Sequence, residues 1–395
     1  MNYEFPIIKH LDDVLPAIKN AEEFKVYEKD EYIVVNYVMQ GNDTFPPILH
    51  PDTRYPLYMR EDNNAMIRRE CRGLIFNKNG KLIRRAFHKF FNMGERKETL
   101  NVDFNDNHWI LEKLDGSMIT PLPLNEGIRW ATKMGITDVS MQAEVFVAKN
   151  PRYTKLAKYL LEADLLPIYE WCSPKNRIVI DHKEDNLILT AVRNQTHGNY
   201  YSYNDIKTLA NDFGIPIVKQ FDPPEYMESV YESVDMEGIV VSFYNGHKVK
   251  VKSDWYVAIH RAKDNLLHEK RVLELILDNK LDDILPHLPE PDKEKLLAYQ
   301  QGFLDGIKET AKLTDMIWSK VKSDGWTRKE FALNMASNLE PYWPAIIFTC
   351  WNDGMGFLDA TINIIRKNLS SQSTVDKVRH LWNENLKWNY GATYE

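Results

Sequence analysis

The chain changes character near residue 262, and this change sets the strongest limit on how it can fold. Before that point, short runs rich in β-branched and aromatic residues alternate with turn residues, as in Tyr32–Val38, Ile178–Ile180 and Gly238–Phe243. The dipeptide Asn245-Gly246 lies between two such runs and is typical of a β-hairpin turn. Helical patterns separate other runs. This part of the chain is therefore predicted to be an α+β domain.

Beyond residue 262 the apolar residues recur with the period of an α-helix. Leu296, Tyr299 and Phe303 follow this spacing. Thr327, followed by Glu330 three residues later, has the pattern of a capping box that opens a helix. We therefore predict two domains, an α+β domain over residues 1–262 and an all-helical domain over residues 263–395, and the second lies within the usual size range.

Composition excludes several classes of protein. The formal charge of −7 over 395 residues argues against a protein that coats nucleic acid unselectively, although it allows a local basic groove. Three scattered cysteines are too few for a disulfide framework or a zinc cluster. The N-terminus lacks a secretory pattern, and no apolar run approaches the ~18 residues of a membrane span. We expect a cytoplasmic, monomeric protein that does not bind membranes.

The run Lys113-Leu114-Asp115-Gly116-Ser117 carries the most chemical information. It has the K-x-D-G form used by enzymes that attach a nucleotide to their own lysine. The pattern is weak alone, because an apolar strand followed by Asp-Gly is also an ordinary strand-to-turn element. Its meaning therefore depends on the residues that accompany it.

A nucleotidyl-lysine enzyme also needs cations for phosphates and carboxylates for a metal ion and a ribose. Glu170 ends an apolar run, and Glu237 precedes Gly238. Lys248, Lys250 and Lys252 alternate with valines, so all three share one face of a strand. Each feature has a simpler interpretation, such as a solvated edge strand for the lysines or a surface ion pair for either glutamate. Their joint occurrence in this order favours the functional interpretation.

Taken together, these segments resemble the bacteriophage RNA ligase 1 family, one branch of the covalent nucleotidyltransferases. The resemblance is strongest between residues 70 and 260, and the chain departs from the family near residues 40–66 in a proline-rich segment. It implies antiparallel sheets with flanking helices in the first domain. The segments that carry it are Glu70-Cys71-Arg72-Gly73, Lys89-Phe90-Phe91-Asn92, Lys113-Leu114-Asp115-Gly116-Ser117, Glu170 with Ser173–Val179, Glu237-Gly238 and Lys250–Tyr256.

The resemblance implies an ATP-dependent RNA ligase. Lys113 would attack the α-phosphorus of ATP and carry AMP, which would pass to an RNA 5′-phosphate before an RNA 3′-hydroxyl closes the bond. Lys250 and Lys252 would contact the α-phosphate, and Glu170 would accept a ribose hydroxyl. Glu237 would hold Mg²⁺ (or Mn²⁺). The remaining residues implied at the nucleotide are Tyr37, Arg72, Lys89, Asp115 and Gly116, while Tyr256 aligns with a tyrosine needed for ligation.

Four matters stay open from the sequence. Asp282-Asp283 aligns with an acidic pair that takes a metal ion in the family, but a helix cap or solvated turn explains it equally well. In the family the helical domain gives preference for nicked tRNA, which would make tRNA repair the role and broken tRNA the partner. A DNA ligase, a capping guanylyltransferase or an RNA-binding module without turnover are the alternatives, and the sequence does not decide between ATP and GTP.

Overall fold

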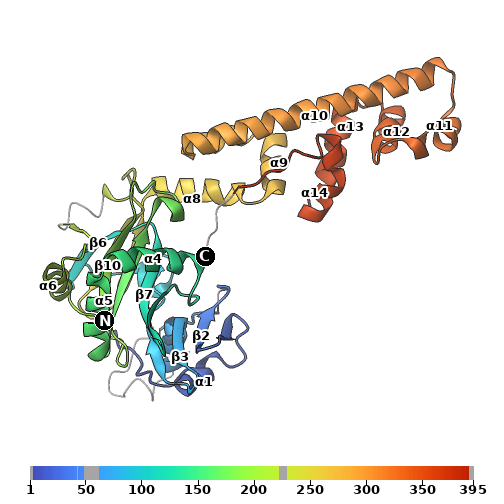
Figure 1. The fold of residues 1–395 in the computed structure, drawn as a ribbon. Coiled ribbons are helices and arrows are strands. Elements are labelled where there is room, and N and C mark those ends of the chain that lie inside the picture. Colours follow the sequence, from blue (N-terminus) through green and yellow to red (C-terminus); the bar gives the residue numbers. More distant parts are fainter. Residues whose placement is uncertain (1–2, 42, 49–61, 222–228, 391–395) are drawn as a thin grey trace. The chain divides into compact units, whose positions relative to one another are not determined.

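The computed structural model describes residues 3–41, 43–48, 62–221 and 229–390, and in it the chain divides into two compact units, Met1–Val257 and Ala258–Glu395 (Figure 1). The first unit holds the described strands together with short helices. The second unit is helical. The predicted boundary at residue 262 stays a prediction, as does the assignment of RNA specificity to the segment beyond it.

The described strands of the first unit form three sheets. All neighbouring strands are antiparallel, as expected, except that β5 and β13 run parallel. One sheet has the order β1-β2-β3-β4, with strands Phe24–Glu28, Tyr32–Tyr37, Arg72–Asn77 and Leu82–Arg84. The second has the order β10-β9-β7-β8, with strands Asn186–Asn194, Leu165–Cys172, Ser117–Leu124 and Gly127–Ala131. The third has the order β11-β6-β12-β13-β5, with strands Gln220–Phe221, His108–Lys113, Gly238–Phe243, Lys248–Lys252 and Phe91–Asn92.

Helices supply apolar faces that bury these sheets. Apolar side chains of α4 (Asp138–Lys149), α5 (Arg152–Glu162) and α6 (Tyr203–Phe213) form one buried cluster with side chains of β9 and β10, such as Tyr169 and Leu189. A separate cluster on the third sheet contains Ile110, Ile239 and Val249. The other described α-helices that lie wholly in the first unit are α1 Leu15–Ile18, α2 Asn63–Glu70 and α3 Lys97–Leu100.

The long helix α10, Glu290–Ser323, contributes a row of buried side chains to the apolar core of the second unit (orange in Figure 1). Leu296, Tyr299, Phe303 and Ile307 are buried along it at helical spacing, as the sequence predicts. The capping box predicted at Thr327 and Glu330 is present. The other helices are α9 Glu269–Leu277, α11 Arg328–Asn334, α12 Trp343–Asp353, α13 Phe357–Lys367 and α14 Gln372–Val378, and α8 Asp254–Leu266 begins in the first unit and ends in the second.

One predicted strand is absent. Ile178–Ile180 does not pair with another strand, although its residues are β-branched and apolar. The backbone N–H groups of Val179 and Ile180 instead donate to the carboxylate of Asp115. A side chain distant in sequence thus provides the hydrogen bonds that a neighbouring strand would otherwise supply.

None of the described helices is long and apolar enough to cross a membrane. Much of the proline-rich segment predicted near residues 40–66 lies outside the described residues.

Candidate active site

Three strands of the third sheet bring Lys113, Glu237 and Lys252 together. In the pairing register, Gly238 lies opposite Lys113 on one side and Lys252 on the other. Glu237 precedes Gly238, and its Oε1 lies 2.6 Å from Lys113 Nζ and 3.1 Å from Lys252 Nζ. The glutamate side chain is 5% exposed, whereas the two lysines are 21% and 29% exposed. The candidate nucleophile is therefore ion-paired but still accessible.

Gly238 is required for this arrangement. Its φ of +147° lies where side chains are disfavoured, and a Cβ atom there would collide with the carbonyl oxygen of Val251. Only glycine lets β12 begin so close to β13, which in turn brings Glu237 between the two lysines.

The turn after Lys113 is held by Asp115, which is almost fully buried. Its Oδ1 accepts a hydrogen bond from Tyr256 Oη at 2.7 Å. Its Oδ2 accepts from the backbone N–H groups of Val179 and Ile180 at 2.8 and 2.7 Å. At Gly116 a Cβ atom would collide with the carbonyl oxygen of Trp171. Asp115 and Gly116 therefore shape the turn that presents Lys113, and nucleotide binding by these two residues stays a prediction.

Glu170 approaches the same place from the second sheet, where it pairs with Met118 across β9 and β7. Burial raises the pKa of Glu170 to about 8, and the negative charge of Glu237 adds to this effect. The positive charges of Lys113 and Arg72 act in the opposite direction. With this pKa the carboxyl group is mostly protonated at neutral pH and can donate as well as accept a hydrogen bond, and its predicted binding of a ribose hydroxyl stays a prediction.

A group of cations lies beside these carboxylates. Burial lowers the pKa of Lys250 well below its usual value, and the positive charges of Lys89, Lys113 and Arg72 lower it further. Burial is also the main cause that lowers the pKa of Lys89, whose Nζ lies 5.4 Å from the ring centre of Tyr37. Cations brought together in this way repel one another, and an anionic ligand would relieve that repulsion.

Tyr37 lies beside the cations Arg72 and Lys89. Burial alone would raise the pKa of its hydroxyl, but the charges of Arg72, Lys89 and Lys133 outweigh that effect, and the pKa lies below its usual value. Lys133 was missed by the sequence interpretation, since a single lysine in a turn carries no motif. Its carbonyl oxygen occupies the space that a Cβ atom at Gly73 would need, so the residue after Arg72 has to be glycine.

The sequence interpretation also missed the role of Asn176 in this part of the structure. Asn176 Nδ2 donates to Ser117 Oγ at 2.9 Å, and His182 Nε2 lies 2.5 Å from the carbonyl oxygen of Asp115. The segment between them is therefore fastened to the Lys113 turn at several points. The run Ser173-Pro174-Lys175-Asn176-Arg177 was part of the resemblance to the ligase family. The apolar residues that follow it, Ile178–Ile180, were predicted to be a strand.

The acidic pair Asp282-Asp283 belongs to the second compact unit, whereas Lys113, Glu170 and Glu237 belong to the first. Asp282 is exposed in the 3₁₀ turn η4, Leu281–Asp283. Among the residues that the structure describes, no group of three or more His, Cys, Asp or Glu side chains is arranged to hold a metal ion. Metal binding by Asp282 and Asp283 stays a prediction.

Comparison with known proteins indicates the class of enzyme. Residues 70–256 match the model of a family described as RNA ligase. A Thermovibrio ammonificans protein provisionally named RNA ligase is 27% identical over 329 residues, which span 80% of this chain and 82% of that protein. RNA ligase 1 of bacteriophage TS2126 is 24% identical over 261 residues, 60% of this chain and 63% of the phage protein. The solved structure of an archaeal ATP-dependent RNA ligase is 12% identical with a TM-score of 0.41, over 65% of this chain and 67% of that one.

The matched segment contains Arg72, Lys89, Lys113, Glu170, Glu237 and both Lys250 and Lys252. The match over residues 70–256, together with the two relatives, supports the phage RNA ligase 1 family for this chain, and the enzyme that it indicates is an RNA ligase.

Proposed function

We propose that this RNA ligase is ATP-dependent and works through a covalent lysyl-AMP on Lys113. The observation that carries the proposal is the accessible amine of Lys113, held 2.6 Å from Glu237 at the margin of a group of partly buried cations. Such a group fits the phosphates of a nucleotide, because it supplies positive charge that protein carboxylates only partly balance.

Three steps follow from this assignment. First, Lys113 Nζ bonds to the α-phosphorus of ATP, the bond to pyrophosphate breaks, and the amine loses a proton. Second, an oxygen of an RNA 5′-phosphate bonds to the same phosphorus, the P–N bond breaks, and the lysine regains a proton. Third, an RNA 3′-hydroxyl loses its proton to solvent and its oxygen bonds to the 5′-phosphorus, while AMP leaves with the electrons of the broken pyrophosphate bond.

The residues divide these tasks. Glu237 Oε1 is in position to receive the proton that Lys113 loses. Lys250 and Lys252 would stabilise charge on the α-phosphate, while Arg72 and Lys89 would bind the other phosphates or the ribose. Carboxylate oxygens are the ligands that Mg²⁺ and Mn²⁺ prefer, so Glu237 fits a divalent cation, which would supply further neutralisation of phosphate charge.

The RNA substrate is proposed from the family alone. Ends bearing a 5′-phosphate and a 3′-hydroxyl, above all those of a nicked tRNA, would be joined, with the segment 263–395 contributing the preference for tRNA. The role would then be tRNA repair in the cytoplasm, which for a phage-encoded protein is that of the bacterial host.

The test is incubation with α-labelled ATP and magnesium, followed by a denaturing gel. We expect a labelled protein band for the wild type and for Lys183→Ala, an exposed lysine of the neighbouring loop, and no band for Lys113→Ala. Labelled GTP in a parallel reaction decides the base. A folded wild type whose lysine is not already adenylylated, and which stays unlabelled, would contradict the proposal.

The same protein is then given a labelled strand with 5′-phosphate and 3′-hydroxyl ends. Joining of RNA and not of nicked DNA supports the proposed substrate. Joining of DNA alone would favour a DNA ligase, and adduct formation without any joining would favour a capping-type enzyme.

A further inference from the structure

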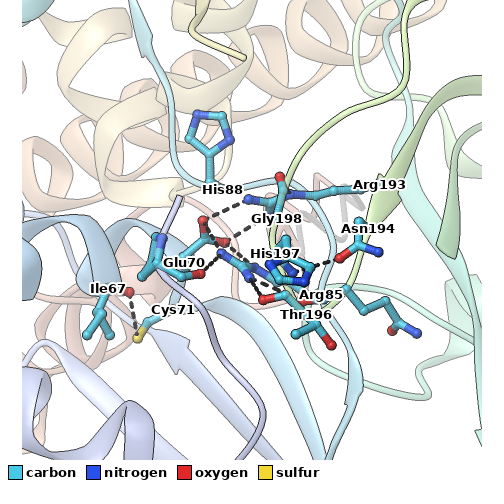
Figure 2. Close-up of polar contacts among 12 residues, drawn as sticks. Ile67, Glu70, Cys71, Arg85, His88, Arg193, Asn194, Thr196, His197 and Gly198 are labelled. Carbon is cyan, nitrogen blue, oxygen red and sulfur yellow. Dashed lines mark hydrogen bonds and ion pairs between the residues drawn. The ribbon is translucent and has the colours of Figure 1, made fainter. Parts of the chain in front are cut away.

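A buried carboxylate, Glu70, binds two arginines at once (Figure 2). Glu70 Oε1 lies 2.9 Å from Arg85 Nη2 and 2.7 Å from Arg193 Nη2. Glu70 Oε2 accepts from Arg85 Nε at 3.1 Å and from Arg193 Nη1 at 2.9 Å. The side chains of both arginines are fully buried, and that of Glu70 is 1% exposed. Both carboxylate oxygens are thus shared by both guanidinium groups.

The remaining donors of the two arginines bind backbone carbonyl groups. Arg85 Nη1 donates to the carbonyl oxygens of Gln195 and Thr196, at 3.2 and 2.9 Å. Arg193 Nε donates to the carbonyl oxygen of Gly198 at 2.7 Å, and its Nη1 donates to that of Ala86 at 2.5 Å. Figure 2 shows Thr196 and Gly198 on the turn that faces Arg85 and Glu70. Arg85 Nη2 also donates to the carbonyl oxygen of Pro6 at 2.9 Å, so the cluster joins four separate segments of the chain.

Two of these segments lead directly to the predicted nucleotide-binding cations. Glu70 is the last residue of α2, and Arg72 opens β3 two residues later. Arg85 and the bonded carbonyl of Ala86 lie at the start of the segment that reaches Lys89. The backbone N–H of Lys89 donates in turn to the carbonyl oxygen of Arg69, at 2.6 Å. The positions of Arg72 and Lys89 thus depend on the same carboxylate, although neither side chain binds it.

We propose that Glu70 is a positioning residue for nucleotide binding, which acts through Arg85 and Arg193 to fix the backbone that carries Arg72 and Lys89. The proposal rests on the proposed function, since it assumes that these two cations bind the nucleotide. Misplacing such a group by about 1 Å is enough to weaken catalysis strongly. A purely structural cluster would instead affect stability without affecting the use of ATP.

The decisive variant is Glu70→Gln, which keeps the shape of the side chain and removes its charge. Single-turnover labelling of Lys113 at increasing ATP concentration gives a half-saturating concentration and a maximal rate. We expect the half-saturating ATP concentration to rise at least tenfold, with a maximal rate within about threefold of the wild type. Glu70→Asp, which keeps the charge on a shorter side chain, should restore part of the affinity.

Ile206→Ala is the matched control, because Ile206 is buried on α6 in the same unit and outside the Glu70 cluster. It should lower the melting temperature and leave the half-saturating ATP concentration within twofold of the wild type.

A folded Glu70→Gln protein with unchanged ATP dependence would overturn the proposal, as would an equal loss of affinity in Ile206→Ala. If Glu70→Gln does not fold, Glu70→Asp decides by the same measurement. Failure of the proposed function is distinct, because the wild type itself would then form no adduct.

Discussion

Each compact unit contains a buried glutamate that binds arginine, and the two differ in what surrounds them. Glu70 in the first unit is shared by Arg85 and Arg193. Glu269 in the second unit binds the single arginine Arg379, with Nη1–Oε1 and Nη2–Oε2 distances of 2.5 and 2.6 Å. Tyr299 Oη, at 2.7 Å, and the backbone N–H of Trp388, at 3.1 Å, complete the shell of Glu269 Oε1.

The difference lies in the balance of charge. The Glu70 cluster has one more positive than negative charge, whereas Arg379 is balanced by Glu269 and also by Asp376. Unpaired positive charge recurs in the first unit. Burial lowers the pKa of Arg84 to about 9, and no described carboxylate lies within ion-pair distance of it. Burying a charge without a partner is costly, so a fold retains such charges where an anion uses them. The comparison suggests that the Glu269 cluster serves stability and the Glu70 cluster serves the site.

The largest effect is expected from Glu269→Gln, which breaks a buried bidentate ion pair. The free energy of unfolding of the second unit should fall by about 3–5 kcal/mol, the usual cost of leaving a buried charge unpaired. Denaturant titration followed by tryptophan fluorescence measures this loss, because Trp382 and Trp388 are buried in this unit. The rate of Lys113 labelling should stay within twofold of the wild type. If Glu269→Gln also slowed Lys113 labelling, the contrast between a glutamate that serves stability and one that serves the nucleotide site would be wrong.

A second effect concerns Lys248, which is buried in the first unit close to Arg193. Its Nζ donates to Ser242 Oγ at 2.5 Å and lies 4.5 Å from the ring centre of Tyr200. Burial lowers the pKa of Lys248 to about 7, and the charge of Arg193 contributes. The unfolded chain, with a lysine pKa near 10.4, therefore binds an extra proton between pH 7 and pH 10, and stability is lost as the pH falls through this range.

Lys248→Met removes this titration while it keeps the volume of the side chain. Relative to the wild type, the variant should gain up to about 1.4 kcal/mol for each unit by which the pH falls from 9.5 to 7. Below pH 7 the gap should stay constant. Melting curves of both proteins across this range provide the measurement. A gap that does not change with pH would show that Lys248 keeps its charge in the folded protein.

Much of the arrangement could be predicted from local pattern. The helical period identified α10, and the capping box at Thr327 marked the start of α11. The alternation of Lys248, Lys250 and Lys252 with valine predicted the strand β13. These features depend on neighbours in the sequence, so the sequence alone contains the necessary information.

What could not be predicted depends on contacts between distant residues. Ile178–Ile180 has the composition of a strand, yet Asp115 takes its backbone N–H groups, and no local pattern indicates that. Likewise, Glu70 belongs to the segment Glu70-Cys71-Arg72-Gly73 that resembles the ligase family. Its pairing with Arg85 and Arg193 could not be predicted, because these partners lie 15 and 123 residues away. The burial of Lys248 and Lys250 could not be predicted either, because a Lys-Val-Lys-Val-Lys strand is more often a solvated edge of a sheet.

The smallest effect is expected from Tyr256→Phe, and it tests the hydrogen bond between Tyr256 and Asp115. Tyr256 lies in the first turn of α8, which begins in the first unit and reaches Leu266 in the second. Its hydroxyl donates to Asp115 Oδ1, and Lys252 Nζ lies 4.8 Å from its ring centre. The variant keeps the ring and removes one hydrogen bond to a charged group, so Lys113 labelling should slow about tenfold, equivalent to about 1.4 kcal/mol.

Tyr203→Phe is the control for this loss, because Tyr203 is a buried tyrosine of the same unit whose hydroxyl donates to the carbonyl oxygen of Val218 at 2.9 Å. It should lower stability and leave labelling unchanged. If Tyr256→Phe slows labelling while Tyr203→Phe and Glu269→Gln do not, the hydrogen bond from Tyr256 to Asp115 helps to present Lys113. If both controls slow labelling as much as Tyr256→Phe does, the contact with Asp115 has no special part in presenting Lys113.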